Sequence, residues 1–148
     1  MKTLLKKASF VIGVLFCFMN ILCEDLDDLD DSGICDSQVV VDEGLYQNLT
    51  SANFEFINAE IVDNCLNIEI GASGCDGSSW EFELVASEAI AESLPEQRFL
   101  KFQLVNEEMC LAVFESSISF DLTPLQIDGS SEILLNVEGL ASSLNYKY

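Results

Sequence analysis

Six cysteines are the residues of this chain best suited to covalent chemistry, and they fall into two groups. Cys17 and Cys23 lie within or next to an apolar N-terminal run. The other four are spread through the rest of the chain: Cys35, Cys65, Cys75 and Cys110. Zinc sites built from cysteines usually contain Cys-x2-Cys pairs, and these are missing here. We therefore expect two disulfides and no metal site.

Four cysteines allow three pairings, and their spacing alone does not choose among them. We expect Cys35 to pair with Cys65, and Cys75 with Cys110. Each bond would close a loop of about 30 to 35 residues, which is worth on the order of 3 to 4 kcal/mol in the chain-entropy treatment of disulfides.

The rest of the catalytic inventory is poor. The chain has no histidine, which excludes Ser-His, Cys-His and His-metal arrangements. Paired carboxylates, as in glycoside hydrolysis, remain available. With 26 acidic residues some pair is inevitable, however, and none has a distinctive context. We predict no catalytic residue and no cofactor.

The first 23 residues have the composition of a signal peptide. Lys2, Lys6 and Lys7 form a basic start, and residues 10–19 form an apolar run of the length that export requires. Asn20 and the acidic residues that follow shortly after make this run too short for a permanent membrane span. We expect this segment to direct export.

Two processing routes compete at Cys23. Cleavage after Cys23 would discard it with the signal, whereas cleavage before it would leave an N-terminal cysteine that carries lipid. Ile21 is a poor residue for the first route and Leu22 is a poor one for the second, since small residues are usual there. We favour a lipid on Cys23, which would tether the protein to a membrane.

The segment that follows, residues 24–34, is predicted to be an acidic flexible tether, because it holds six carboxylates and little apolar surface. Three of the six basic residues precede Cys23, so 26 acidic and three basic residues remain after it, a formal charge of −23. Such a charge repels nucleic acid, whose binding requires lysine and arginine at the phosphates. We expect no nucleic-acid partner.

From residue 35 to 148, apolar and polar residues alternate in several short runs, which indicates strands with one face on a core. The clearest runs are 54–56, 66–70, 80–84, 100–104, 118–120 and 133–137. They predict an all-β fold: one antiparallel β-sandwich, Ig-like or related, braced by disulfides. We expect a hairpin-like loop at 71–78, a tighter loop at 106–108, and a helical turn at 86–94.

Two side chains are candidates for a ligand surface. Trp80 could be an exposed platform on which sugars stack, although a core position is the more usual one for such a tryptophan. Arg98 is surrounded by acidic residues on an expected loop. For Arg98 a local ion pair is the simpler explanation than a ligand clamp.

Four segments together resemble a group of small uncharacterised exported proteins and lipoproteins of flavobacteria and other Bacteroidota. They are residues 63–80, 91–100, 119–125 and 146–148. This resemblance covers most of the domain and implies no activity. It implies a Gram-negative cell, in which a cysteine followed at once by acidic residues, as Cys23 is, resembles a signal for lipoprotein export to the surface.

We therefore expect an exported, lipid-anchored, non-catalytic β-sandwich of the bacterial cell envelope. Its partner would be an unknown envelope protein or a glycan, at the outer membrane or cell surface. Without the lipid, the protein would be periplasmic or secreted. Two alternatives stay open: a secreted hydrolase that uses carboxylates, and a soluble structural protein with no ligand.

Overall fold

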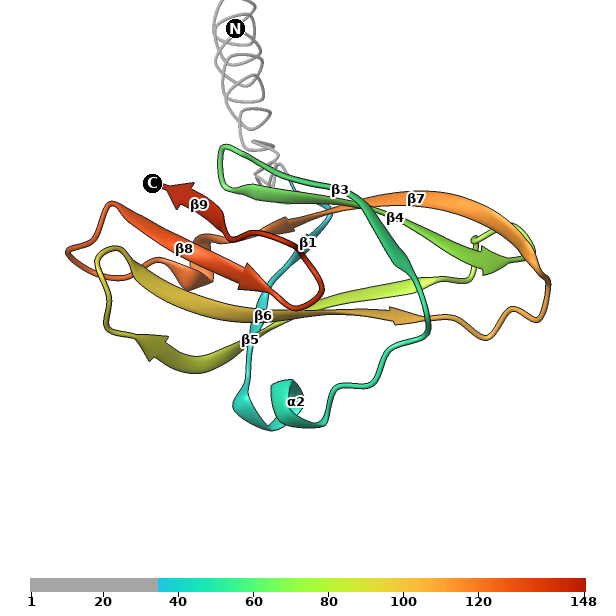
Figure 1. The fold of residues 1–148 in the computed structure, drawn as a ribbon, viewed down its shortest axis with the longest axis horizontal. Coiled ribbons are helices and arrows are strands. Elements are labelled where there is room, and N and C mark those ends of the chain that lie inside the picture. Colours follow the sequence, from blue (N-terminus) through green and yellow to red (C-terminus); the bar gives the residue numbers. More distant parts are fainter. Residues whose placement is uncertain (1–34) are drawn as a thin grey trace, which may run out of the picture. The chain divides into compact units, whose positions relative to one another are not determined.

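A computed structural model describes residues 35–148 of the chain. The signal segment 1–23, the tether 24–34 and the lipid site at Cys23 lie outside the described residues. The expected fold class is confirmed, because two β-sheets pack face to face and two disulfides brace them (Figure 1).

The first sheet has four strands in the order β1-β7-β4-β3. Their bounds are β1 Ser37–Gln38, β7 Ala112–Asp121, β4 Cys65–Gly74 and β3 Glu55–Val62. The longest pairing joins β4 and β7 antiparallel from Cys65↔Asp121 to Gly74↔Ala112. A β-bulge between Phe56 and Asn58 interrupts the pairing of the edge strand β3 with β4.

The second sheet has five strands in the order β2-β5-β6-β8-β9. Their bounds are β2 Val40–Val41, β5 Glu81–Ala91, β6 Glu96–Val105, β8 Glu132–Val137 and β9 Leu144–Lys147. Strands β6 and β8 run parallel, as do β2 with β5 and β1 with β7. The sandwich is thus mainly antiparallel, with three parallel pairings that period-two patterns do not predict.

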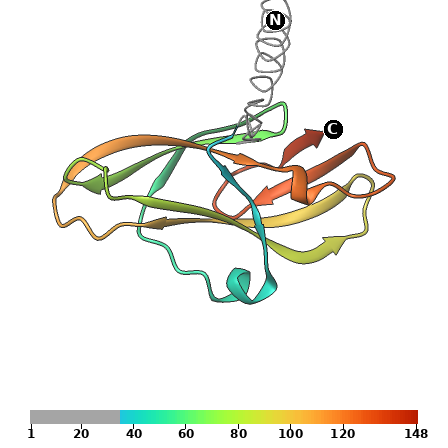
Figure 2. The same cartoon turned by 180° about the vertical axis from the view of Figure 1, so that it is seen from behind.

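The first described segment belongs to both sheets. Strand β1 pairs with β7, the buried Val39 follows, and β2 then pairs with β5 in the other sheet. Figure 2 shows this segment crossing from one sheet to the other. It leads into α2 (Glu43–Asn48), whose N-cap Asp42 accepts a hydrogen bond from the Leu45 N–H. This helix was not predicted from the sequence.

The expected helical turn at 86–94 is wrong. Strand β5 runs through Ala91 and pairs with β6 as far as Ala91↔Gln97. Alanine and glutamate favour helix in isolation, but Val85 and Ala86 are fully buried, and packing in the sheet outweighs this local preference. A short 3-10 helix, η1 (Thr123–Leu125), follows β7 instead.

The core lies between the sheets, where the alternating apolar residues of each long strand point inward. Its largest fully buried side chains include Tyr146, Phe120, Leu66 and Leu100. Phe102 contacts aromatic rings from both sheets, with its centroid 5.9 Å from Phe82 in its own sheet and 6.1 Å from Phe120 in the other. The alternation seen in the sequence therefore marks the packed faces.

Two loops pass between the sheets at the same end of the sandwich. The β4–β5 loop, residues 75–80, leaves the first sheet for the second, and the β6–β7 loop, residues 106–111, returns. The loop expected at 71–78 is therefore not a hairpin, because the strands on its two sides belong to different sheets. We call the part of the domain formed by these two loops the loop end.

Candidate functional site

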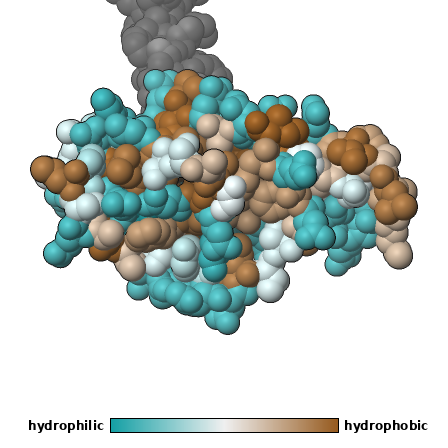
Figure 3. Space-filling view, in the orientation of Figure 1, coloured by the Kyte–Doolittle hydropathy of each residue, from teal (hydrophilic) through white to brown (hydrophobic). Residues whose placement is uncertain are grey.

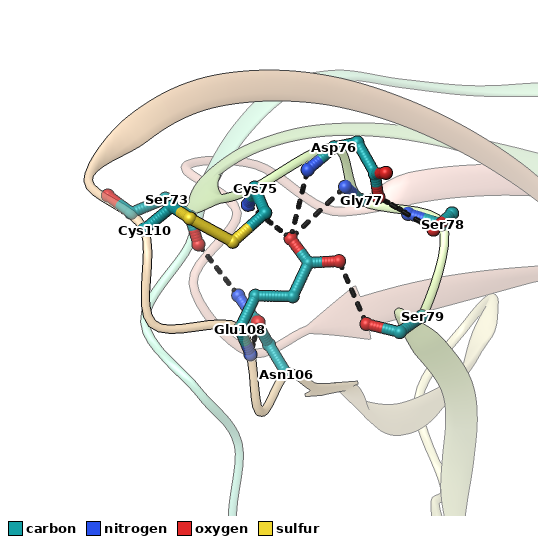
Figure 4. The surroundings of a disulfide bond; sticks show 9 residues. All are labelled: Ser73, Cys75, Asp76, Gly77, Ser78, Ser79, Asn106, Glu108 and Cys110. Atoms are coloured by element: carbon teal, nitrogen blue, oxygen red, sulfur yellow. Dashed lines mark hydrogen bonds between the residues drawn. A yellow bond between two sulfur atoms is a disulfide. The ribbon is translucent and has the colours of Figure 1, made fainter.

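The loop end is built around the disulfide between Cys75 and Cys110, whose Cα atoms lie 4.8 Å apart (Figure 4). The other disulfide, Cys35–Cys65, joins the start of the described chain to the start of β4. These are the two pairings selected in the sequence analysis. The Cys75–Cys110 bond lies at the surface and fixes one crossing loop to the other.

Glu108 provides a second connection between the two loops. Its Oε2 accepts hydrogen bonds from the backbone N–H groups of Cys75, Asp76 and Gly77, the last two at 3.2 Å. Its Oε1 accepts the Ser79 hydroxyl at 2.8 Å. Figure 4 shows the carboxylate inside the curve of the β4–β5 loop. Three successive N–H groups that converge on one oxygen form an anion-binding nest.

These contacts keep Glu108 ionised. Burial is the largest single influence and acts to raise the pKa, but the hydrogen bonds together outweigh it. They lower the pKa of Glu108 from its ordinary 4.5 to about 2. Ionised groups make stronger hydrogen bonds than neutral ones, so the nest binds a full negative charge.

Short-range contacts hold each loop in shape. The Asp76 carboxylate accepts both the Ser78 hydroxyl at 2.6 Å and the Ser78 N–H at 2.9 Å, and these bonds lower the pKa of Asp76. The Asn106 side-chain oxygen accepts the Glu108 N–H at 2.9 Å, and its amide group donates across to the Ser73 carbonyl of β4 at 2.8 Å. Gly77 has φ of 74°, where glycine is the favoured residue.

The Trp80 ring packs against the β4–β5 loop from the core side. Trp80 is 7% exposed and belongs to the core, so the alternative of an exposed stacking platform does not hold. Its ring packs under Gly77 and edge-on to Phe82, at 6.4 Å between centroids. Gly74 lies so close that a β-carbon there would be 2.9 Å from Cζ2 of this ring.

Arg98 is also buried, at 8% exposure, and lies on β6 instead of a loop. The expected ion pair is wrong: both ion pairs among residues 35–148 involve lysines, Lys101–Glu138 and Lys147–Glu132. Burial lowers the pKa of Arg98, Tyr148 acts in the opposite direction, and the Arg98 Nε has no hydrogen-bond partner. Arg98 faces inward because it shares the alternation of β6 with Leu100.

Apolar side chains protrude into solvent from the loop end and from the adjoining start of β7. Met109, Leu111 and Val113 are 95%, 90% and 72% exposed. Figure 3 shows hydrophobic surface at the right-hand end of the domain, where the β6–β7 loop lies in Figure 1. The sequence analysis did not select these residues. The sequence feature that could have identified them is the run 109–113, which is apolar throughout, whereas the neighbouring strands alternate apolar and polar residues.

A groove on another part of the domain is the second candidate. It has a volume of about 580 Å³ and is lined by Phe54, Phe56, Glu55 and Glu138 among others. Lys101 also borders it, with its Nζ 3.8 Å from Glu138 and 4.6 Å from the centre of the Tyr46 ring. The ammonium group therefore compensates one of the two carboxylates in this groove.

Two further features bear on the function classes. Within residues 35–148, no group of three His, Cys, Asp or Glu side chains is arranged to hold a metal ion. The described part of the chain also has no helix that is both long and apolar enough to span a membrane.

No protein-family model and no curated protein matches this chain. Solved structures share its fold. They include a "protein of unknown function DUF1344" from Bacteroides vulgatus (14% identity, TM-score 0.50) and a "putative toxin related protein" from Parabacteroides distasonis (16%, 0.50). A "NigD-like immunity protein" from Bacteroides caccae is 10% identical, with a TM-score of 0.52.

These matches cover 76%, 76% and 74% of this chain. They cover 56%, 59% and 57% of the three solved chains, so this protein spans less than three fifths of each. At such low identity the likeness concerns the fold.

Proposed function

We propose that this protein is an exported, non-catalytic binding protein of the bacterial cell envelope, anchored by lipid at Cys23. Its ligand would be a protein or glycan of that envelope. The segment 1–23 has the composition of an export signal. Two disulfides within 114 residues suit an oxidising compartment outside the cytoplasm.

The observation that carries the binding role is the rigid display of exposed apolar side chains at the loop end. Met109 and Leu111 flank the disulfide-bonded Cys110, and Glu108 anchors the same loop to the nest. A loop held in this way loses little conformational entropy when a ligand binds. Exposed apolar residues grouped on a fixed surface are typical of an interaction site.

The carboxylates favour this role over that of a hydrolase. A glycosidase needs a general acid whose pKa is raised, usually by an apolar environment. Every carboxyl group of the described residues whose pKa is displaced has it lowered: Asp36, Glu43, Asp76, Glu108 and Asp121. In the groove, the Lys101 ammonium group lies 3.8 Å from the Glu138 carboxylate.

The solved structures of similar fold also support a non-catalytic protein of the bacterial envelope. One is described as an immunity protein and another as a protein of unknown function, and all three come from Bacteroides or Parabacteroides. An origin in bacteria related to these genera fits a surface lipoprotein in which Cys23 precedes an acidic tether.

The test of the anchor is the intact mass of the protein isolated from membranes of the organism that makes it. A mass that begins at Cys23 and includes acyl chains is expected. Cys23→Ala should abolish both the added mass and the membrane association. A mass that begins at Glu24 without lipid, or a cytoplasmic protein whose cysteines are free thiols, would contradict the proposal.

A further inference from the structure

A second feature extends the exposed apolar loop onto the outer face of the first sheet. Ile57 lies over Gly71, where a β-carbon would be 3.5 Å from Ile57 Cδ1. Ile57 and Val113 line a hollow of about 480 Å³ whose floor contains Gly71. With Met109 and Leu111, these two residues form what we call the loop-end patch: Ile57, Met109, Leu111 and Val113.

Acidic residues border this patch. Glu55 pairs with Gly71 on one side, and Glu115 pairs with Gly71 on the other, so that both carboxylates point to the same face of the sheet. Glu107 lies in the β6–β7 loop two residues before Met109, and Asp76 lies in the β4–β5 loop next to the disulfide-bonded Cys75. The apolar centre therefore has a negative rim.

No basic residue compensates this rim. The three basic residues in the described range are Arg98 and Lys101 on β6 and Lys147 on β9. Arg98 is buried, and the two lysines pair with Glu138 and Glu132. The acidic groups around the patch thus present uncompensated negative charge to a partner.

We propose that the loop-end patch binds a folded envelope protein whose contact surface has an apolar hollow bordered by lysine and arginine. This rests on the proposed function and names the partner class. An apolar centre that excludes water would supply most of the affinity, and the opposite charges would speed and orient association. A second copy of this chain would bring two acidic rims together, and an anionic membrane would repel the same rim.

The experiment uses the full-length chain in the cells that make it, with a photoreactive side chain in place of Met109. The matched control has the same group at Leu94, which is 99% exposed at the opposite end of the β5–β6 hairpin. The expected result is an adduct with one protein from position 109 and not from 94, in which the cross-linked surface is rich in lysine and arginine.

The captured protein is then purified and its affinity measured. We expect Leu111→Asp to weaken binding about tenfold or more, and Leu94→Asp to leave it unchanged. Paired reversals Glu55→Lys and Glu115→Lys should slow association, and added salt should do the same in the wild type. Circular dichroism would confirm that each variant is folded.

Several results would overturn the partner assignment. They are adducts with lipid, glycan or another copy of this chain, a partner with an acidic contact surface, or affinity unaffected by Leu111→Asp. If the captured partner binds the Leu111→Asp variant as tightly as the wild type, the protein is still a binding protein, but the loop-end patch is not its binding surface. If neither position gives an adduct and the mass shows no lipid, both proposals fail.

Discussion

The Glu108 carboxylate lies 2.8 Å from the Ser79 hydroxyl, although the two residues belong to loops that connect the sheets in opposite directions. Together with the nest at Cys75–Gly77, this contact fixes the β6–β7 loop against the β4–β5 loop. The Cys75–Cys110 disulfide joins the same two loops two residues beyond Glu108. The exposed Met109 and Leu111 are therefore displayed from a frame with both covalent and polar bracing.

Glu108→Gln should loosen the nest without removing the disulfide. The amide has one acceptor oxygen and a donor group that cannot serve the backbone N–H groups. Hydrogen exchange at Cys75, Asp76 and Gly77 should become about tenfold faster or more, while exchange in the core strands stays the same. Glu107→Gln is the matched control, since the adjacent Glu107 is exposed and should leave these amides protected.

The low pKa of Glu108 also predicts how stability depends on pH. A carboxyl group with a lower pKa in the folded state stabilises the fold above its unfolded pKa and loses this effect as the pH falls through the folded pKa. For Glu108 the loss should occur between about pH 4.5 and pH 2. Denaturant unfolding at several pH values should show a steeper decline for the wild type than for Glu108→Gln. Equal slopes would contradict the nest as the cause.

The two disulfides should differ in their reaction with reductant. Cys75 and Cys110 are exposed, whereas Cys65 is buried. Under limiting reductant the folded protein should lose the Cys75–Cys110 bond first, because thiol exchange requires access to a sulfur. Alkylation followed by peptide mass spectrometry identifies the order. Reduction of Cys35–Cys65 first would refute the difference in access.

Loss of the loop-end disulfide should also reduce stability. The bond spans 35 residues, and the chain-entropy treatment gives about 3 to 4 kcal/mol for a loop of this size. The double variant Cys75→Ser with Cys110→Ser should show a lower denaturant midpoint and weaker protection in residues 106–111. Amide protection in β8 and β9, which the bond does not touch, should fall only as much as the global stability falls.

Alternation of apolar and polar residues was enough to predict the sheets, because it records which side of each strand is buried. It predicted the runs around Leu66, Leu84 and Leu100, and it gave the all-β fold. The prediction failed at Ala86–Leu94, where alanine and glutamate favour helix but pairing with β6 makes a strand as far as Ala91. Helix propensity describes isolated residues and does not include the pairing across the β5–β6 hairpin or the burial of the strand.

The candidate site was harder to predict for a related reason. The glycine-rich segment 71–78 was expected to be a loop, whereas β4 continues to Gly74 and the loop begins at Cys75; the partner of this loop, Glu108, lies more than 30 residues further along the chain. Nothing in a run of acidic residues distinguishes Glu108 from Glu107. Arg98 was misplaced because the acidic residues around it in sequence suggested an ion pair on a loop, whereas β6 places its side chain on the buried face beside Leu100.

Gly74→Ala tests how tightly the loop end is packed. Its new methyl group would lie 2.9 Å from the Trp80 ring and close to the Glu108 carboxylate, so the nest or the ring must move. Overpacking of this kind costs about 1 to 3 kcal/mol. Gly71→Ala, on the same strand, places its methyl 3.5 Å from Ile57 and should be tolerated. Thermal unfolding of both variants would show whether the difference exists.

Arg98→Met should stabilise the protein, which is the opposite of the usual effect of removing a charged side chain. Arg98 is buried without a carboxylate partner, and its Nε makes no hydrogen bond. Replacing a buried charge with an apolar side chain of similar length is often worth about 1 kcal/mol or more. The urea midpoint should therefore rise.

The matched variant is Lys101→Met, three residues along the same strand. Lys101 donates to the Tyr46 carbonyl at 3.0 Å and lies 3.8 Å from Glu138, so its removal should lower the midpoint. Opposite changes in the urea midpoint for the two variants would distinguish a charged side chain that has partners from one that has none. If Arg98→Met lowers the midpoint as well, the guanidinium makes a stabilising contact, and the burial argument for this residue is wrong.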